Sequence, residues 1–460
     1  MPGALPAGVT EAVLLAEVTA CLAGLPPGAA AVTGVSGGAD SAALALLVHR
    51  ARPDLALTAV HVRHGLREDA LDAAAAASLA STLGIPFIER RVRVTRGRSG
   101  VEAAAREARY EALRQAARET GACAVLVGHT ADDQAETVLL ALARGAGVRG
   151  ISAMAGSRSD GDLVLLRPIL RARRADVRSV ATAAGLSTVE DPTNADPDQR
   201  RARARHNVLP ALASLSGGSG DPVGTLTRLA ALARDDADLL DQIAAVEVAA
   251  HIVRWGPVRA VRAAAVDALP RAIARRVVRR LLEEAGGAAE SAGVERVLAL
   301  QEGGRLHVAG EVEVVAGAGW LSAAPVRRAD LPQRDLPVPG AVELPEVGLV
   351  LRAAHGVPPT DASGPFPPRA RTPEGPHAAA AVVLGADAAA GLVVRGLQPG
   401  DRIVGRRVRE SMRSLGVPWA ARGLVPVVAL LGGHPVWAPG IAAAVPPAEP
   451  AVAVWVDHLG

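Results

Sequence analysis

Short apolar runs alternate with alanine-rich helical stretches along the first half of the chain. The runs predict buried strands at residues 30–35, 55–62, 86–94 and 122–127. The stretches between and after them predict helices at residues 41–50, 68–83, 101–120 and 132–142. Strands and helices that alternate at this spacing favour parallel pairing, so we expect an α/β fold with a parallel sheet covered on both faces. Ligands of such sheets bind at the carboxyl ends of the strands.

The pattern changes after residue 213. A Ser/Gly-rich stretch at residues 214–222 indicates a linker, helical spacing returns at 225–251 and 269–284, and residues 306–321 predict a hairpin. Seven prolines between Val357 and Pro376 predict a flexible connection. We therefore expect four segments, which are a parallel-sheet domain at 1–213, a mainly helical middle domain at 223–325, a Pro-rich linker at 326–377 and a small α+β C-terminal domain at 378–460.

Composition excludes several classes of protein. The 460 residues include 50 Lys+Arg, of which none is lysine, and 47 Asp+Glu, which leaves a net charge of +3. Without lysine the chain offers neither a Schiff base nor the lysine of a Walker A loop. Its two cysteines, Cys21 and Cys123, exclude a disulfide scaffold and a Cys-rich zinc site.

A membrane span and an export signal are not expected. The longest uncharged run, Leu424 to Pro447, carries Pro426, Pro435 and Pro439, so it predicts no spanning helix. The N-terminal apolar stretch contains Glu11 and Glu17 and has no basic region before it. We expect a cytoplasmic protein. The sequence does not determine its oligomeric state, and a homodimer is compatible with it.

A glycine-rich loop follows the first strand and opens the first helix. It reads Ser36-Gly37-Gly38-Ala39-Asp40-Ser41. Glycines let the backbone approach an anion, the helix N-terminus directs N–H groups at it, and the serines add hydroxyl donors. Because a carboxylate repels phosphates, Asp40 would lie next to them only with a cation such as Mg²⁺ beside it. The alternative is a plain glycine-rich turn between a strand and a helix.

Three acids begin the helix after the fourth strand. Asp133 and Glu136 are three residues apart, so they share one helix face. Paired acids can hold a cationic substrate and accept its proton. The alternative is that Asp132 caps the helix and the other acids form a solvated turn. His129 just before them is interpreted either as a contact to nucleotide or substrate or as a packed turn histidine.

The loop resembles the PP-loop, S-G-G-x-D-S, of the ATP pyrophosphatases, which cut ATP between the α and β phosphates. Further motifs narrow this resemblance to the tRNA(Ile)-lysidine synthase family. They are His61 to Arg67, Arg106 to Tyr110, Gly128 to Thr137, Arg144 to Gly147, Gly150 to Met154, Arg167 to Leu170, Glu190 to Asn194, Arg201 to His206, Gly400 to Arg402 and Leu415 to Gly440. The resemblance is dense over residues 30–212 and weaker through the middle of the chain.

The resemblance implies a ligase that forms a carbon–nitrogen bond. Such an enzyme adenylates C2 of the wobble cytidine of a CAU-anticodon tRNA(Ile), and the ε-amine of free L-lysine then displaces AMP. The anticodon then reads AUA instead of AUG. Residues 1–213 would form the catalytic domain, and the middle and C-terminal domains would bind tRNA.

The resemblance also implies roles for individual residues. It places ATP on Ser36, Gly37, Gly38, Ala39, Asp40 and Ser41, with Mg²⁺ held by Asp40 through ATP. It implies that lysine is bound by Asp133, Glu136 and His129. The catalytic set is then Asp40, Asp133, Arg109 and Arg205.

Basic clusters predict contacts to tRNA phosphates. They lie at residues 171–178, 274–280 and 401–413, and the individual candidates are Arg201, Arg203, Arg402, Arg406 and Arg407. The alternative for each cluster is an ordinary solvated face.

Three positions depart from the family pattern. Arg63 stands between His61 and His64 where a small polar residue is usual, Ala202 replaces an asparagine, and Thr130 replaces a histidine. Arg63 and Ala202 leave open a non-catalytic protein that binds tRNA or ATP. A tRNA thiolase of the same superfamily is the other alternative, but it would use a C-x-x-C pair, a persulfide cysteine or an iron–sulfur cluster.

Overall fold

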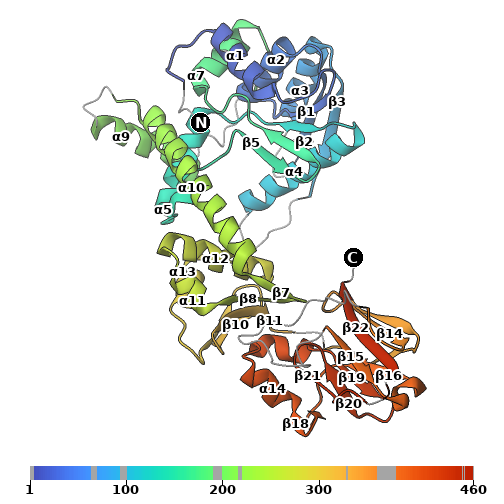
Figure 1. Ribbon diagram of the computed structural model, residues 1–460. Helices are drawn as coiled ribbons and strands as arrows, with labels where there is room; N and C mark the ends of the chain where they lie inside the picture. The colour runs from blue at the N-terminus through green and yellow to red at the C-terminus, as the bar shows by residue number, and fades with distance from the viewer. Residues whose placement is uncertain are drawn as a thin grey trace. The chain divides into compact units, whose positions relative to one another are not determined.

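The computed structural model describes residues 5–63, 70–93, 101–189, 199–215, 220–327, 330–359, 380–447, 449 and 451–458. The chain forms two compact units, Met1–Asp238 and Leu239–Gly460 (Figure 1). Of the expected linkers at 214–222 and 326–377, residues 216–219 and 360–377 lie outside the described residues.

A six-stranded sheet forms the centre of the first unit. Its strands are β1 (Ala30–Gly34), β2 (Ala56–Arg63), β3 (Phe87–Arg91), β4 (Ala124–Leu126), β5 (Ser157–Asp160) and β6 (Leu163–Leu166). They lie in the order β3-β2-β1-β4-β6-β5. All neighbours pair in parallel except β5 and β6, which are antiparallel. The predicted parallel α/β fold is confirmed.

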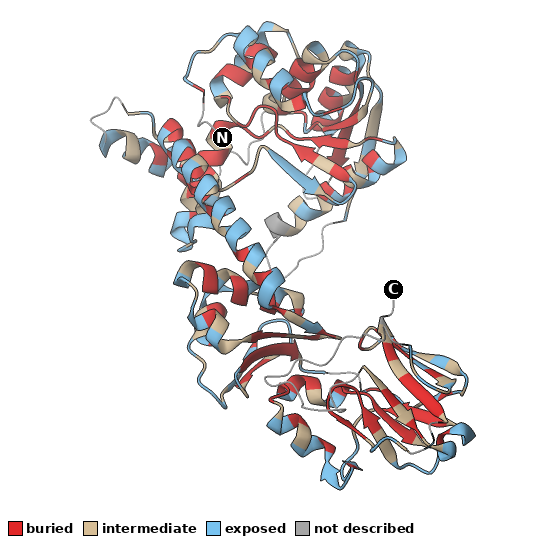
Figure 2. Cartoon of the chain, in the orientation of Figure 1, coloured by how far each residue is buried: buried red, intermediate tan, exposed pale blue. Residues whose placement is uncertain are grey.

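Helices cover both faces of this sheet. The helices that pack on the sheet are α1 (Glu11–Leu22), α2 (Ala39–Ala51), α3 (Ala70–Leu83), α4 (Val101–Glu119) and α7 (Arg174–Ala183). The unit also contains α5 (Ala131–Ala143), α6 (Val148–Ile151), α8 (Arg200–Arg203), the π-helical turn η2 (Ala204–Val208) and α9 (Leu209–Leu215), and α10 (Pro222–His251) begins in it. One core joins α1, α2 and α7 to β1, β2 and β4, whereas α4 packs Leu113 and Ala116 against Val32 and Val60. Figure 2 shows these strands as mostly buried.

The boundary between the units differs from the predicted one. The first turns of α10 pack Val223, Leu226 and Ala230 against Ala135 and Val138 of α5. The start of the predicted middle domain is therefore part of the first unit, because apolar side chains of α10 complete the core beside α5.

The predicted middle domain is mainly helical, as expected, and α10 is its longest helix. It contains α11 (Ala263–Asp267), α12 (Arg271–Glu284) and α13 (Ser291–Leu298). It also contains a five-stranded sheet of β7 (Val253–Trp255), β8 (Val258–Arg262), β9 (Arg305–Val308), β10 (Val312–Gly317) and β11 (Trp320–Pro325) in the order β7-β8-β11-β10-β9. The predicted hairpin is thus three strands of a larger antiparallel sheet, whose inner face packs on α12.

Part of the predicted Pro-rich linker is folded. Residues 326–359 contain β12 (Arg334–Leu336), β13 (Gly340–Leu344) and β14 (Leu349–His355). Strand β14 pairs along its whole length with β22 (Val452–His458), so this stretch belongs to the C-terminal fold. The apolar alternation of β14 outweighs the neighbouring prolines because its inward side chains are buried.

The rest of the second unit completes two sheets and a short hairpin. The elements are β15 (Ala381–Leu384), η4 (Ala386–Ala390), β16 (Leu392–Arg395), β17 (Arg402–Ile403), β18 (Arg406–Arg407), α14 (Val408–Ser414), η5 (Trp419–Leu424), β19 (Val427–Leu430), β20 (Pro435–Ala438) and β21 (Ala442–Ala443). The sheets run β12-β16-β19-β20-β21 and β13-β14-β22-β15. The uncharged run at 424–447 forms three of these strands, and no helix in the described part of the chain is long and apolar enough to cross a membrane.

A buried ion pair organises the loop after β16. Asp401 accepts hydrogen bonds from Arg395 at 2.8 and 2.9 Å, and both side chains are only 6% exposed. Burial raises the pKa of Asp401, but the hydrogen bonds from Arg395 and from the N–H of Gln398 outweigh it, so the pKa lies below its usual value. The contribution of this pair to stability is therefore present above the unfolded-state pKa of about 3.9 and is lost as the pH falls through the lower folded-state pKa.

We expect Asp401→Asn to lower the free energy of unfolding of the second unit by about 3 kcal/mol, because it leaves a buried guanidinium without its counter-charge. All five tryptophans lie in this unit, so tryptophan fluorescence during urea unfolding of the whole chain reports on it. As a control, Asp457→Asn removes an exposed partner of Arg352 and should cost less than about 1 kcal/mol. Equal losses in the two variants would contradict the role given to the buried pair.

Candidate active site

The glycine-rich loop between β1 and α2 is held in one conformation. Gly37 has a φ of 84°, and a Cβ atom there would lie 2.7 Å from the backbone oxygen of Asp72. Only glycine fits this position without moving α3. The Ser41 hydroxyl accepts from the Ser36 N–H at 3.0 Å and donates to the Gly38 oxygen at 2.9 Å. These contacts shape the loop before any ligand arrives.

Asp40 lies at the start of α2 and faces two guanidiniums of α7. Its carboxylate oxygens lie 3.4 Å from Nε of Arg174 and 3.3 Å from Nε of Arg178. The pKa of Asp40 is nevertheless raised, because burial outweighs the attraction of these arginines. A further cation nearby would stabilise the charged form of Asp40.

The N-terminus of α5 is closed by a capping box that includes Asp133. Thr130 is the N-cap residue, and its hydroxyl accepts from the Asp133 N–H at 3.4 Å. One oxygen of Asp133 accepts from the backbone N–H and the hydroxyl of Thr130, at 2.8 and 2.9 Å. The alternative that Asp132 caps this helix is wrong, because its carboxylate accepts from the backbone N–H of Arg174 at 2.7 Å.

Arg174 joins the acids of α5 to the glycine-rich loop. Its guanidinium contacts Asp133 at 2.6 Å and Glu136 at 3.2 Å, besides Asp40. Burial lowers the pKa of Arg174, but the carboxylates of Asp133, Glu136, Asp40 and Asp132 together raise it. The prediction that Asp133 and Glu136 share one face is therefore confirmed.

Glu136 lies at the bottom of this cluster. It is 0% exposed, and its Oε1 atom also accepts from Nε of Arg205 at 2.8 Å. Its other oxygen, Oε2, is buried without a hydrogen-bond partner among the residues that the structure describes. A buried carboxylate oxygen without a donor is costly, so this atom is where an added donor would be stabilised most.

His129 is buried next to the acids and remains neutral. Burial is the largest cause that lowers its pKa, to about 3. Nε of Arg167 donates to its Nδ1 atom at 3.3 Å, so the imidazole carries its proton on Nε2. A neutral imidazole can donate a hydrogen bond here without adding charge.

Three arginines surround the only tyrosine of the chain. The guanidiniums of Arg106 and Arg109 lie 5.4 and 5.6 Å from the ring centre of Tyr110, and Arg106 donates to its hydroxyl at 3.4 Å. Arg167 is the third, and it also lowers the pKa of Tyr110. The structure thus places Arg109 in a cationic cluster next to His129, whereas Arg205 lies on Glu136.

The other predicted residues lie in varied surroundings. His61 is buried and bonds the Val35 oxygen through Nδ1 at 2.9 Å, and Arg63 contacts Glu89 at 3.4 Å. Ala202 is buried on α8 beside half-buried Arg201 and exposed Arg203. Arg402, Arg406 and Arg407 are exposed on the β17–β18 hairpin of the second unit. His64 and residues 190–194 lie outside the described part of the chain.

Sequence reasoning missed Arg174 and Arg167 as site residues. The cluster at 171–178 was expected to contact tRNA, but Arg171, Arg173, Arg174 and Arg178 all pair with carboxylates of this unit. The signal was present in the order of elements, since β6 and β4 are parallel neighbours and the segments after both strands meet at one sheet edge.

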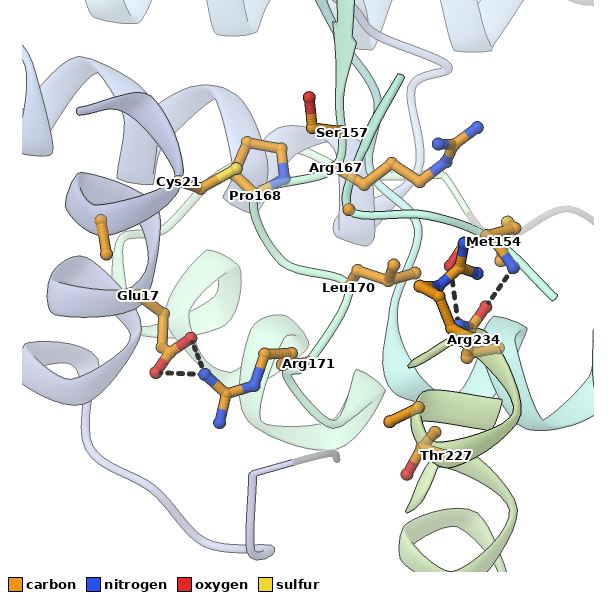
Figure 3. Close-up of a pocket in the computed structure, with 14 residues that line it drawn as sticks. Glu17, Cys21, Met154, Ser157, Arg167, Pro168, Leu170, Arg171, Thr227 and Arg234 are labelled. Carbon is orange, nitrogen blue, oxygen red and sulfur yellow. Dashed lines mark hydrogen bonds and ion pairs between the residues drawn. The ribbon is translucent and has the colours of Figure 1, made fainter. Parts of the chain in front are cut away.

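A cavity of about 350 Å³ lies on the other side of Arg167. Figure 3 shows the Glu17–Arg171 ion pair on one side of it and Arg167, Met154 and Arg234 on the other. Gln134 of α5 borders it and bonds both backbone atoms of Met154. The residues that line the cavity therefore include Gln134 of α5, the helix that also carries Asp133 and Glu136.

Both cysteines are free and partly buried. Cys21 borders this cavity, and burial raises its pKa to about 11. Cys123 is half-buried on the other side of β1's start and bonds the Ala30 oxygen at 3.6 Å. Both thiols are free, and Cys21 and Cys123 are about a hundred residues apart in the sequence, so they do not form the C-x-x-C pair that a thiolase would use.

Comparisons with known proteins agree with this geometry. Residues 16–212 match the PP-loop domain family. The tRNA(Ile)-lysidine synthase of Salinispora arenicola is 47% identical over 50% of this chain and 69% of its own length. That of Symbiobacterium thermophilum is 31% identical over 91% of this chain and 90% of its own length.

A solved structure, the U34-tRNA thiolase NcsA from Methanococcus maripaludis, covers 48% of this chain and 79% of its own at 18% identity, with a TM-score of 0.41. That similarity is too weak to bear on the reaction. The first unit contains the PP-loop, and a relative matches almost the whole chain. The chain therefore belongs to the tRNA(Ile)-lysidine synthase family.

Proposed function

We propose that this chain joins L-lysine to C2 of the wobble cytidine of a CAU-anticodon tRNA(Ile). In the first step the C2 carbonyl oxygen attacks the α-phosphorus of ATP, the α–β phosphoanhydride bond breaks and pyrophosphate leaves. In the second step the neutral ε-amine of lysine attacks C2, the C2–O bond breaks and AMP leaves. The proton that the lysine ammonium gives up before its attack goes to a carboxylate of the site.

The buried oxygen of Glu136 carries this proposal. It is an unpaired acceptor in a site where Asp133 supplies a second carboxylate, and the chain itself contains no lysine to fill it. An ε-ammonium donates three hydrogen bonds and would meet both acids. Arg174 links these acids to Asp40 of the PP-loop, which brings the ammonium site next to the nucleotide site.

The two acids differ in what they can do. Burial raises the pKa of Asp133, but Arg174 and the Thr130 hydrogen bonds outweigh it and lower the pKa. A carboxylate of low pKa is a weak base, so Asp133 holds the ammonium by its charge. Glu136, through Oε2, accepts the proton.

The PP-loop is the ATP site, and Asp40 would hold Mg²⁺ there together with the phosphates. The fit rests on the raised pKa of Asp40, which shows that Arg174 and Arg178 leave its charge incompletely compensated. One carboxylate with phosphate oxygens and waters is a common set of Mg²⁺ ligands. The ion would neutralise charge on the phosphates, while Ser36 and Ser41 donate hydroxyl hydrogen bonds to them.

The exposed arginines would bind the tRNA backbone. Arg402, Arg406 and Arg407 present charge from the β17–β18 hairpin, and exposed Arg203 does so from α8, with half-buried Arg201 as a further candidate on the same helix. Contacts of this kind supply affinity and salt dependence rather than sequence choice.

We expect the purified chain, given ATP, Mg²⁺, labelled L-lysine and a CAU-anticodon tRNA(Ile) transcript, to release AMP and pyrophosphate and to incorporate lysine in equal amounts. A transcript with uridine at the wobble position is the control and should incorporate none. Release of pyrophosphate without incorporation of lysine would contradict the proposed reaction.

We expect Asp133→Asn and Glu136→Gln each to lower the rate of lysine transfer by about 100-fold or more, because each removes a charge that holds or deprotonates the amine. Binding of tRNA, measured by filter retention, should change little. The control is Asp238→Asn, which removes an exposed partner of Arg149 in the same unit. Turnover like that of the unchanged chain in either site variant would refute the assignment.

We expect the double substitution Arg406→Gln/Arg407→Gln to weaken tRNA binding and to reduce the slope of log affinity against log salt by about 1.5, since each lost phosphate contact contributes roughly 0.7 to 0.9. Arg352→Gln, in an exposed ion pair of the same unit, is the control. An unchanged slope would show that the hairpin does not contact phosphates.

A further inference from the structure

The active site has two regions of opposite charge that meet at His129. On one side lie Asp133 and Glu136, and on the other lie the guanidiniums of Arg106, Arg109 and Arg167. The charges of Asp133 and of all three arginines act on the imidazole of His129. Arg167 touches it directly, and His129 precedes the cap of the helix that carries the acids.

The cationic region lacks a counter-charge. Among the described residues, Arg106, Arg109 and Arg167 form no ion pair with a carboxylate, and they contact the ring and hydroxyl of Tyr110, the imidazole of His129 and the Ala155 oxygen. By contrast, Arg114, further along α4, pairs with Glu107, Glu111 and Asp160.

The energetics of this region favour an anion. Burial is the largest cause that lowers the pKa of Arg109 and of Arg167, and neighbouring arginines lower both further. Like charges that are gathered and desolvated in this way are unfavourable unless an anion joins them. An anion that donates nothing and accepts from several guanidiniums, such as a carboxylate, fits this set of donors.

We propose that Arg106, Arg109 and Arg167 bind the α-carboxylate of the amino-acid substrate while Asp133 and Glu136 hold its ε-ammonium. This inference rests on the proposed function and adds to it the means by which the enzyme selects a whole amino acid over a simple amine. His129 contacts Arg167 and directly precedes the cap of α5, and its neutral imidazole adds no charge to either region. Tyr110 positions Arg106 and Arg109 by lying beneath both guanidiniums.

The test compares L-lysine with L-lysinamide, which keeps both amines and loses only the negative charge. For the unchanged chain we expect kcat/KM for lysine to exceed that for lysinamide by about 10- to 100-fold, the range that one or two charge-assisted hydrogen bonds supply. Arg106→Gln and Arg167→Gln should raise KM for lysine by a similar factor and lower kcat/KM for lysine more than for lysinamide, so that the preference for lysine falls toward 1.

The controls separate this inference from its alternatives. Arg118→Gln changes an exposed arginine of the same helix and should alter neither substrate. Arg167 is buried and bonds the Ala155 oxygen, so the half-buried Arg106 gives the decisive variant if Arg167→Gln does not fold.

Equal losses for lysine and lysinamide in the Arg106 variant would mean that the cluster binds ATP or tRNA, and would overturn the inference. Equal use of lysine and lysinamide by the unchanged chain would overturn it as well. Incorporation of neither substrate by the unchanged chain would instead overturn the proposed function, and the inference with it.

Discussion

The contact of Arg174 with three carboxylates is the interaction on which the site depends. Asp40 comes from the loop after β1, and Asp133 and Glu136 come from the helix after β4. Glu136 is fully buried and Asp40, Asp133 and Arg174 are largely so, and their charges are stabilised because the guanidinium contacts all three carboxylates and the capping box donates further hydrogen bonds to Asp133. The same contact aligns the PP-loop with the acids, so the nucleotide and the amine would be held by one connected network.

The site has an acidic and a cationic region, so a substrate that carries both a positive and a negative charge can bind with each charge next to groups of the opposite sign. The acids gather on α5 and the unpaired arginines gather around Tyr110, with a neutral histidine between them. Burial strengthens the attraction between these groups and a charged ligand, since the same charges in water would attract the ligand only weakly. A chain without lysine cannot satisfy the acids with ammonium groups of its own side chains, and no donor among the residues that the structure describes pairs with Oε2 of Glu136.

The second unit shows why its boundaries were hard to predict. Strand β14 lies within the proline-rich stretch, and its partner β22 lies about a hundred residues later, so no local pattern reveals the pair. The motif Gly400-Asp401-Arg402 is visible in the sequence, but its aspartate forms a buried ion pair with Arg395. That pair depends on the packing of the folded unit. The division into domains at residues 1–213, 223–325 and 378–460 remains a prediction, although the packing of Val223, Leu226 and Ala230 of α10 against α5 places the start of this helix with the first unit.

Sequence alone determined the parallel α/β order, the PP-loop and the pairing of Asp133 with Glu136, because each is a local pattern of strand, turn or helix. It also determined the family, because ordered motifs are specific. Only the tertiary structure decided that Arg174 pairs with the acids of α5 and that Asp132 holds the next helix rather than capping its own. It also decided that Arg106 and Arg167 pair with no carboxylate in the described part of the chain. The physical reason is the same in each case. Whether a charged side chain is paired or buried depends on residues that are close to it in the folded sheet but distant in the sequence. The neighbouring residues along the chain therefore do not predict it.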